Sequence, residues 1–277
     1  QFYERDERFM DNQLDILTDN IFIQSTTDEG RGKAAYKERI AKLPFWKNSH
    51  HVQSIDIKRV APSTLSLEMN ILYQNVGYLP DNTLTNTSLH YSATLQEGLD
   101  NLPKFSEIII SRNTNEPTQA CTSFQDQYPE NRVKSLVHYW LFLIESRPKN
   151  VAHFKELLTE KIDLAFTSRH IQNSEELEIW LNEADNQVER SGHIIDRFDL
   201  TTINDQEYNV EMEFEWRGYM KTQPEVELEA VIDEVLEIHR GGKLKIQSAH
   251  PVHTVEDLRK VYTPGVASVC RLIKEDP

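Results

Sequence analysis

An internal repeat of about half the chain length is the feature that most limits how this 277-residue sequence can fold. Three segments recur in the same order: 14–21 at 155–162, 49–56 at 191–196, and 67–78 at 210–219. The spacing is 141 residues between Leu17 and Leu158 (158 − 17) and 142 between His51 and His193 (193 − 51). This period far exceeds that of solenoid repeats, so the sequence predicts two copies of one domain.

Each copy is expected to place helices before strands. A first helix is predicted over Glu130–Ser146, where apolar residues recur at helical spacing. A shorter helix ends in each Leu-Thr-acid segment, and a third covers Gly32–Leu43 or its counterpart Ser174–Glu189. Period-two alternation over Leu65–Tyr73 indicates a strand with one buried face. Further strands are predicted at Val52–Ile57, Leu89–Leu95, Ser106–Ser111, Ile194–Leu200, Tyr208–Trp216, Glu225–His239 and Lys243–Ala249.

This order of elements indicates an α+β fold rather than a βαβ nucleotide-binding fold. We expect a first domain at 1–112, a linker rich in Asn, Thr, Pro and Gln at 113–128, a second domain at 129–250, and a short separate segment at 251–277.

Composition excludes several classes of partner. The formal charge is −15, with 30 basic and 45 acidic residues, so phosphate backbones and anionic lipid surfaces would repel the chain. No apolar run approaches the roughly 20 residues of a membrane-spanning helix. Two widely separated cysteines, Cys121 and Cys270, predict no disulfide framework and favour the reducing cytoplasm.

Three helices followed by a curved antiparallel sheet resemble the nuclear transport factor 2-like superfamily, whose cone-shaped fold is also called SnoaL-like. The resemblance is carried by Arg31–Tyr36 at the start of the third helix, by Leu43–Trp46, by the histidine that opens the next strand, and by aromatic-x-x-x-Gly strand ends. It implies two cone-shaped domains, each open to a small molecule at its mouth. Some members of that superfamily are isomerases, dehydratases, cyclases or epoxide hydrolases, and many only bind, dimerise or regulate. The fold therefore leaves the function open.

Candidate ligand-binding residues follow from the expected position of the cone. They are Tyr36, Trp46, Tyr73 and Tyr91 in the first copy, and Trp180, His193, Glu213 and Trp216 in the second. The alternative for the aromatic residues is packing between helix and sheet.

Two histidines that recur between the copies, His51 and His193, are candidate catalytic groups; the alternative is a structural hydrogen bond. Asp196 lies three residues after His193, so the two face opposite sides of a strand unless a bulge intervenes. Glu213 and Glu215 share one strand face, where paired carboxylates suit acid–base chemistry or simply face solvent.

No metal site is predicted. His153, Glu156 and Glu160 share one helical face, and His250 and His253 form a close pair, but neither set has a third convergent ligand that the sequence identifies.

The C-terminal segment, 251–277, resembles the opening segment of malic enzymes. The hexapeptide Tyr262–Ala267 (Tyr-Thr-Pro-Gly-Val-Ala) carries the resemblance, which also extends upstream to about residue 239. It implies that Tyr262 corresponds to the general acid in the decarboxylation of malate to pyruvate. Thr-Pro-Gly predicts a turn, followed by a helix over 266–274.

The cofactors of malic enzymes are NAD(P) and Mg²⁺ or Mn²⁺, and we expect them only if a malic enzyme domain follows this segment. None is expected in this chain, because its nine glycines include no Gly-x-Gly-x-x-Gly motif.

Three functions remain open. The first is a module that binds a small organic ligand or mediates regulation and assembly, including as a homodimer, without catalysis of its own, at the N-terminal end of a malic enzyme. The alternative is a stand-alone lyase, isomerase or hydrolase that uses one cone. A third is a dimerisation scaffold whose cones are filled by their own side chains.

Overall fold

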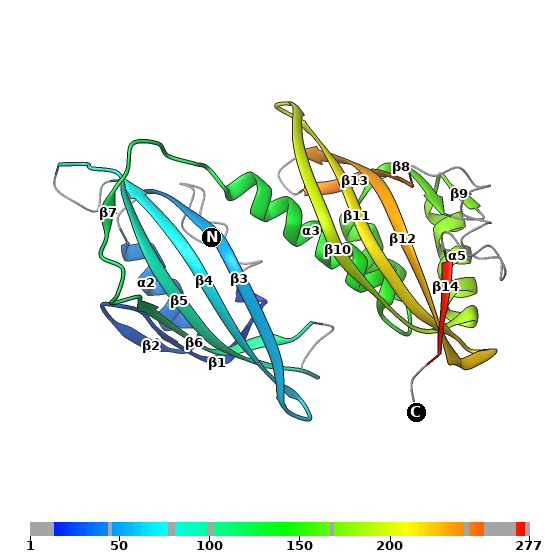
Figure 1. The fold of residues 1–277 in the computed structure, drawn as a ribbon, viewed down its shortest axis with the longest axis horizontal. Helices are drawn as coiled ribbons and strands as arrows, with labels where there is room; N and C mark the ends of the chain where they lie inside the picture. The colour runs from blue at the N-terminus through cyan, green and yellow to red at the C-terminus, as the bar shows by residue number, and fades with distance from the viewer. Residues whose placement is uncertain are drawn as a thin grey trace. The chain divides into compact units, whose positions relative to one another are not determined.

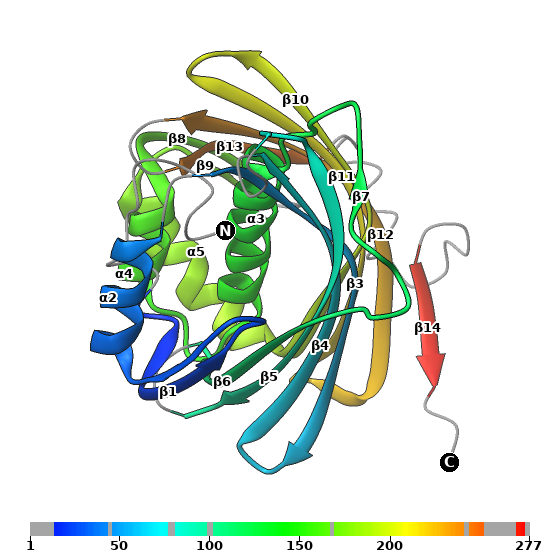
Figure 2. The same ribbon diagram turned by 90° about the vertical axis from the view of Figure 1, so that its left-hand side faces the viewer.

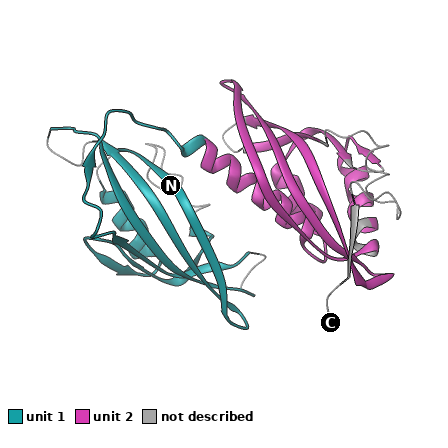
Figure 3. Cartoon of the chain, in the orientation of Figure 1, with its two compact units in different colours: residues 1–129 teal, residues 130–277 magenta. Residues whose placement is uncertain are grey.

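The computed structural model describes residues 14–43, 46–76, 81–98, 102–166, 169–240, 244–251 and 270–274. These residues form a mixed α+β architecture with two seven-stranded sheets (Figure 1). The chain divides into two compact units, unit 1 over residues 1–129 and unit 2 over residues 130–277 (Figure 3). Sheet A belongs to unit 1 and sheet B to unit 2.

Sheet A has the strand order β2-β1-β6-β5-β4-β3, with β7 added beside β5. Neighbouring strands are antiparallel except for β1 and β6, which are parallel. One helix of unit 1, α2 (Lys33–Lys42), lies in the described part of the chain. The strands are β1 (Leu17–Gln24), β2 (Glu29–Arg31), β3 (Lys47–Ala61), β4 (Thr64–Val76), β5 (Thr85–Gln96), β6 (Lys104–Arg112) and β7 (Gln119–Ala120).

Sheet B has the order β9-β8-β13-β12-β11-β10, with β14 beside β12. Its one parallel pair is β8 and β13. Three helices, α3 (Tyr128–Glu145), α4 (Val151–Leu157) and α5 (Ser174–Gln187), lie on one side of this curved sheet (Figure 2). The strands are β8 (Leu158–Phe166), β9 (Arg169–Ile171), β10 (Val188–Asn204), β11 (Glu207–Met220), β12 (Gln223–Arg240), β13 (Leu244–Pro251) and β14 (Cys270–Lys274).

The two sheets share one strand order and one pattern of pairing. Ile23 pairs with Gly30 in sheet A as Leu164 pairs with Ile171 in sheet B, an offset of 141 residues (171 − 30). Between β3–β5 and β10–β12 the offset is 143, as between Met69 and Met212 (212 − 69). We call residues related by these offsets counterparts.

One face of each sheet is apolar because the strands alternate. In β11 the residues Tyr208, Val210, Met212 and Phe214 are all buried, and every second residue between them is more exposed. This face packs against the helices in one core that also includes Trp140 of α3. In the described part of unit 1 the buried cluster is much smaller, and consists of Leu17, Ile21, Ile23, Tyr36 and Ile40.

The predictions of α2, α3, α5 and the long strands agree with these elements. The predicted second helix is present in unit 2 as α4 (Val151–Leu157), but its C-terminal end was placed too late. Residues 17–24 and 158–166 are strands β1 and β8, each paired on both sides. The spacing of Leu17 and Ile21 imitates a helical turn. The register against β6 in fact shifts between Leu17 and Phe22, and this irregularity interrupts the alternation that marks a strand.

Two further expectations need correction. The sheets are not wholly antiparallel, since each contains one parallel pair. The segment predicted as a linker, 113–128, hydrogen-bonds to sheet A, where Gln125 N donates to Gln74 Oε1 (2.8 Å) and Gln127 N donates to Ser49 Oγ (2.9 Å).

The helix predicted over 266–274 is also wrong, because residues 270–274 form strand β14. β14 pairs with Val226–Ala230 of β12, and β13 pairs only with the later part of β12, from Glu234 onwards. The first half of β12 therefore offers backbone groups that a short segment satisfies by joining the sheet.

The match of His51 with His193 is out of register. His193 lies across from Trp216, and the residue in this position of sheet A is His50, which lies across from Tyr73. The offset is therefore 143 for this pair and not 142, because unit 2 has two more residues from the start of its third helix (Ser174 to His193, 19) than unit 1 has (Lys33 to His50, 17).

No helix within the described ranges is long and apolar enough to span a membrane.

Candidate functional site

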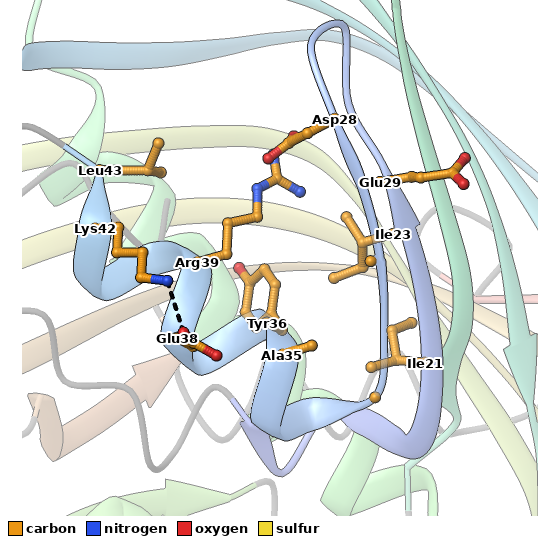
Figure 4. A pocket seen from close by; sticks show the side chains of 12 residues that line it. Ile21, Ile23, Asp28, Glu29, Ala35, Tyr36, Glu38, Arg39, Lys42 and Leu43 are labelled. Carbon is orange, nitrogen blue, oxygen red and sulfur yellow. Dashed lines mark hydrogen bonds and ion pairs between the residues drawn. The ribbon is translucent and has the colours of Figure 1, made fainter.

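A cleft in unit 1 lies between helix α2 and the β1–β2 hairpin and has a volume of about 370 Å³ (Figure 4). Its floor is apolar and belongs partly to the small core of unit 1, and its rim is charged. The residues that line it are Ile21, Ile23, Asp28, Glu29, Gly30, Gly32, Ala35, Tyr36, Glu38, Arg39, Lys42 and Leu43.

The counterparts of two lining residues explain why the cleft is open. A Cβ atom on Gly30 would meet no atom within 4 Å, whereas its counterpart Ile171 is a fully buried core residue. Arg39 corresponds to Trp180 at the same offset of 141 (180 − 39), and Trp180 packs against the core of unit 2. Unit 2 thus carries large apolar side chains at the two positions where unit 1 has a glycine and a cation.

Ion pairs cross the rim of the cleft. Arg39 Nη2 lies 2.7 Å from Asp28 Oδ1, with the Arg39 side chain 21% exposed and that of Asp28 47% exposed. Asp28 sits at a turn and also accepts a hydrogen bond from Ser25 Oγ (2.6 Å). Lys42 Nζ donates to Glu38 Oε1 (2.6 Å) on the outer side of α2, and this hydrogen bond lowers the pKa of the Glu38 carboxyl.

The corresponding hairpin and helix of unit 2 are joined by an ion pair of opposite polarity. Arg169, the counterpart of Asp28, lies on β9, and its Nη2 is 2.9 Å from Oε2 of Glu183 on α5. Glu183 is the counterpart of Lys42. An ion pair therefore joins hairpin and helix in both units, with the signs exchanged and with the helix partner three residues further along in unit 2.

A second polar site in unit 2 joins His193 on β10 to the end of α3. The Glu145 carboxylate accepts hydrogen bonds from the backbone N (2.7 Å) and Nδ1 (2.9 Å) of His193. The His193 side chain is 6% exposed, and its ring packs edge-on against Phe214 at a centroid distance of 5.1 Å. An ionised carboxylate only accepts, so Nδ1 carries the proton in this hydrogen bond. Sequence reasoning missed Glu145, because 48 residues separate it from His193.

The aspartate considered beside His193 does not partner it. Asp196 was predicted to face away from His193 unless a bulge intervenes. A bulge does lie between Ile195 and Arg197 of β10. Asp196 is nevertheless exposed, and the carboxylate that bonds His193 is that of Glu145.

The remaining candidates of unit 2 do not lie on the same side of sheet B. Trp180 and Trp216 are half-buried against the core. The Trp216 indole lies over Gly218, where a Cβ atom would approach it to 2.4 Å. Glu213 lies on the opposite face, in the strand positions across from Arg197 and Asp233, and so is not on the helix-covered side. It shares that outer face with Glu215, as its spacing predicts.

Of the four aromatic candidates in unit 1, one lines the cleft. Tyr36 is 8% exposed and forms part of its floor. Tyr73 packs against the His50 ring at a centroid distance of 4.9 Å on sheet A. Trp46 and Tyr91 are half-buried and do not line the cleft. The structure therefore does not gather these four residues into one site.

The last two catalytic candidates occupy other places. His51 faces the side of β3 opposite to His50, and its Nε2 is buried without a hydrogen-bond partner in the described part of the chain. Tyr262 lies outside the described residues.

A buried carboxyl that the sequence patterns did not single out lies in the core of unit 2. Glu234 of β12 is 7% exposed and lies across from the fully buried Met212, on the face covered by helices. Burial raises its pKa to about 7, and no hydrogen bond or ion pair from a described residue offsets that. Its counterpart in unit 1 is Tyr91 (234 − 91 = 143).

Within the described ranges no group of three or more His, Cys, Asp or Glu side chains is arranged to hold a metal ion. Of the two sets weighed from sequence, His153, Glu156 and Glu160 are described and form no such group. His250 lies 3.4 Å from Asp163, and His253 lies outside the described residues.

No protein-family model matches the chain. A stretch of 52 residues is 50% identical to NAD-dependent malic enzyme 1 of Bacillus subtilis (strain 168), which covers 19% of this chain and 12% of that enzyme. An equally long stretch is 50% identical to the NAD-dependent malic enzyme of Geobacillus stearothermophilus, over 19% of this chain and 11% of that enzyme. The chain thus spans only a small part of the malic enzymes that it matches.

Solved structures similar to parts of the chain include a nuclear transport factor 2-like superfamily protein from Salmonella enterica. The TM-score is 0.40 at 8% identity, over 50% of this chain and 95% of that one. Another is the hexachlorocyclohexane dehydrochlorinase LinA-type3 from Novosphingobium barchaimii, with a TM-score of 0.38 at 14% identity, over 45% and 85%.

Glu234 makes the stability of unit 2 depend on pH. Its pKa is raised from an ordinary 4.5 to about 7 on folding, so stability is greatest below pH 4.5, falls as pH rises towards 7, and then levels off. Glu234→Gln keeps the shape and removes the charge. We expect the variant to match wild type at pH 4 and to be more stable by roughly 3 kcal/mol at pH 8. Urea unfolding at both pH values measures this, and equal stability at pH 8 would contradict it.

Proposed function

We propose that this chain is a small-molecule-binding regulatory module, that its binding site is the cleft of unit 1, and that unit 2 is a closed body without an equivalent site. The observation that carries the proposal is the pair of counterpart positions: Gly30 and Arg39 line the cleft in unit 1, and Ile171 and Trp180 pack into the core in unit 2. These two residues bury less apolar surface in unit 1 than their counterparts do in unit 2. Ligand binding in the open space would account for that loss.

The chemistry of the cleft supports binding better than turnover. Its floor of Ile21, Ile23 and the Tyr36 ring suits an apolar body, and its charged groups lie at the rim. The volume of about 370 Å³ lies within the roughly 300–1,000 Å³ of small-molecule sites. The cationic side chains at the rim, Arg39 and Lys42, are both engaged in ion pairs, which suits recognition rather than proton transfer.

Filling the cleft tests this proposal. Gly30→Ile reproduces the side chain of its unit 2 counterpart in open space, so we expect the fold to persist and binding to be lost. Wild type, screened by thermal shift against small carboxylates, amides and apolar ring compounds, should show a raised midpoint with at least one compound, because a ligand of the native state stabilises it. The matched control is Gly192→Ile, on β10, where a Cβ atom also meets nothing within 4 Å. Its ligand response should equal that of wild type. A response that survives in Gly30→Ile places the ligand elsewhere.

We also propose that the module belongs to the N-terminal part of a malic enzyme. The support is the 52-residue match at 50% identity to malic enzymes together with the Tyr262–Ala267 motif. NAD(P) and a divalent cation would then be bound by the malic enzyme part. The described residues offer no fitting metal-ligand group, so no catalytic step is assigned to them.

The coding sequence beyond Pro277 tests this second part of the proposal, which expects the remaining malic enzyme domain there. If instead an unrelated sequence or a stop codon follows, the link to malate chemistry is lost, and the cleft keeps its own test.

A second candidate function, a lyase or isomerase acting in unit 2, is favoured by one observation. His193 is buried and is oriented by the Glu145 carboxylate through Nδ1, and Nε2 would act as the base. A carboxylate that holds a histidine in this tautomer is a common arrangement for general-base catalysis.

Replacing the histidine separates this candidate from the binding module. Compounds that bind are incubated with the protein, and their conversion is followed by NMR spectroscopy. For the enzyme, His193→Gln should lower the rate by about a hundredfold or more. His51→Gln, in sheet A, should leave it unchanged. Conversion that persists in His193→Gln, or the absence of conversion in wild type, excludes the candidate.

A further inference from the structure

The geometry points to a specific chemical class of ligand for the cleft of unit 1: an organic carboxylate with a short apolar body, whose carboxylate takes the place of the Asp28 side chain on Arg39. This inference rests on the proposed function, because it concerns the same cleft.

Arg39 is a partly buried cation at the edge of the cleft. Its side chain is 21% exposed, compared with 26% for Lys33 and 72% for Lys42 on the same helix. Below it lies the buried Tyr36, and Ile21 and Ile23 of β1 line the same cleft (Figure 4). A charge in such surroundings needs an anion beside it, since water no longer solvates it fully.

The anion that Arg39 has at present uses only part of its hydrogen-bonding edge. Asp28 approaches Nη2, and Nε is buried with no hydrogen-bond partner among the described residues. A carboxylate that binds a guanidinium side-on reaches Nη2 and Nε together, which is the stronger arrangement. A ligand carboxylate at this edge would therefore satisfy a donor that Asp28 leaves unpaired.

Asp28 is suited to give way. Its side chain is 47% exposed, and it stands on the turn of the β1–β2 hairpin, so it can leave Arg39 and be solvated at little cost. Ser25 Oγ already donates to it at 2.6 Å and would remain as its partner. The chain's own carboxylate thus marks the place where a ligand carboxylate would bind. The other rim carboxylate of the hairpin, Glu29, points away from Arg39 (Figure 4).

The apolar lining of the cleft indicates the chemistry of the rest of the ligand. The apolar residues of the lining include Ile21, Ile23 and Leu43, which offer no charged group to a second polar end. An apolar chain or small ring attached to one carboxylate matches this lining better than a dicarboxylate or a sugar acid, whose further polar groups would be left unpaired.

Unit 2 shows what the same position becomes without a ligand. The counterpart of Arg39 is Trp180, packed on the core, and the counterpart of Asp28 is Arg169, whose partner Glu183 lies out on the helix. The position of Arg39 is therefore occupied by an aromatic side chain in unit 2. The cation therefore belongs to the open cleft and is not required by the hairpin-to-helix contact itself.

The test compares an acid with its neutral isostere. Binding of hexanoate and hexanamide to the full chain is measured by isothermal titration calorimetry, with wild type, Asp28→Asn, Arg39→Gln and Lys42→Gln. We expect wild type to bind hexanoate about tenfold more tightly than hexanamide, because the charge-assisted bidentate bond is available only to the acid. Asp28→Asn removes the competing carboxylate, so it should tighten hexanoate by about threefold or more and leave hexanamide unchanged.

The other variants supply the controls. Arg39→Gln should reduce hexanoate binding to the level of hexanamide, and Lys42→Gln, which removes an exposed charge of the same sign, should change it by less than about twofold. If Arg39→Gln does not fold, as judged by circular dichroism, the Asp28→Asn comparison decides alone.

Three results would contradict the inference, and they can be distinguished. Equal binding of acid and amide in wild type, both lost in Gly30→Ile, refutes the carboxylate preference and leaves the proposed function standing. If neither probe binds and no screened compound raises the melting midpoint of wild type, the inference and the proposed function fall together. Asp28→Asn with unchanged hexanoate affinity would also contradict the role given to Asp28.

Discussion

A sheet with one apolar face cannot remain stable in water unless something covers that face, and this requirement organises both units. Alternation along β11 places Tyr208, Val210, Met212 and Phe214 on one side, and the helices of unit 2 supply the side chains that close over them. The hydrophobic gain from this burial is the main source of stability. Everything polar that shares the covered side, such as Glu234 or His193, must therefore either find a partner or shift its protonation equilibrium.

The units meet this requirement to different degrees. In unit 2 the third helix and its hairpin contribute Leu177, Trp180 and Ile171 to a continuous core. In unit 1 the same positions hold Tyr36, Arg39 and Gly30, and a cleft results. Two side-chain differences on an otherwise shared framework are enough to turn a packed contact into an accessible space, because close-packed interiors do not collapse fully around a missing side chain.

Sequence patterns predict most of this framework and little of the site. Long elements with a clear period, such as 65–73 and 130–146, agree with β4 and α3, since burial of one face leaves its mark on every second or every third to fourth residue. The short strand β1 was mistaken for a helix, because a register irregularity gives Leu17 and Ile21 a helical spacing. The histidine pairing was out by one residue, because the two units differ in length before β10. The difference between Gly30 and its counterpart depends on strand pairing, which the sequence does not give. Glu145 contacts His193 from a distant part of the chain, so no local pattern marks it.

The exchanged polarity of the hairpin-to-helix ion pairs bears on how a chain with two similar units reaches its native form. Such chains are prone to misassembly, in which a piece of one unit docks onto the equivalent place in the other. If the hairpin bearing Asp28 docked onto α5, it would meet Glu183, and the hairpin bearing Arg169 would meet Arg39 and Lys42 on α2. Both exchanged contacts bring like charges together, so the electrostatics penalise the crossed pairing and favour the cognate one.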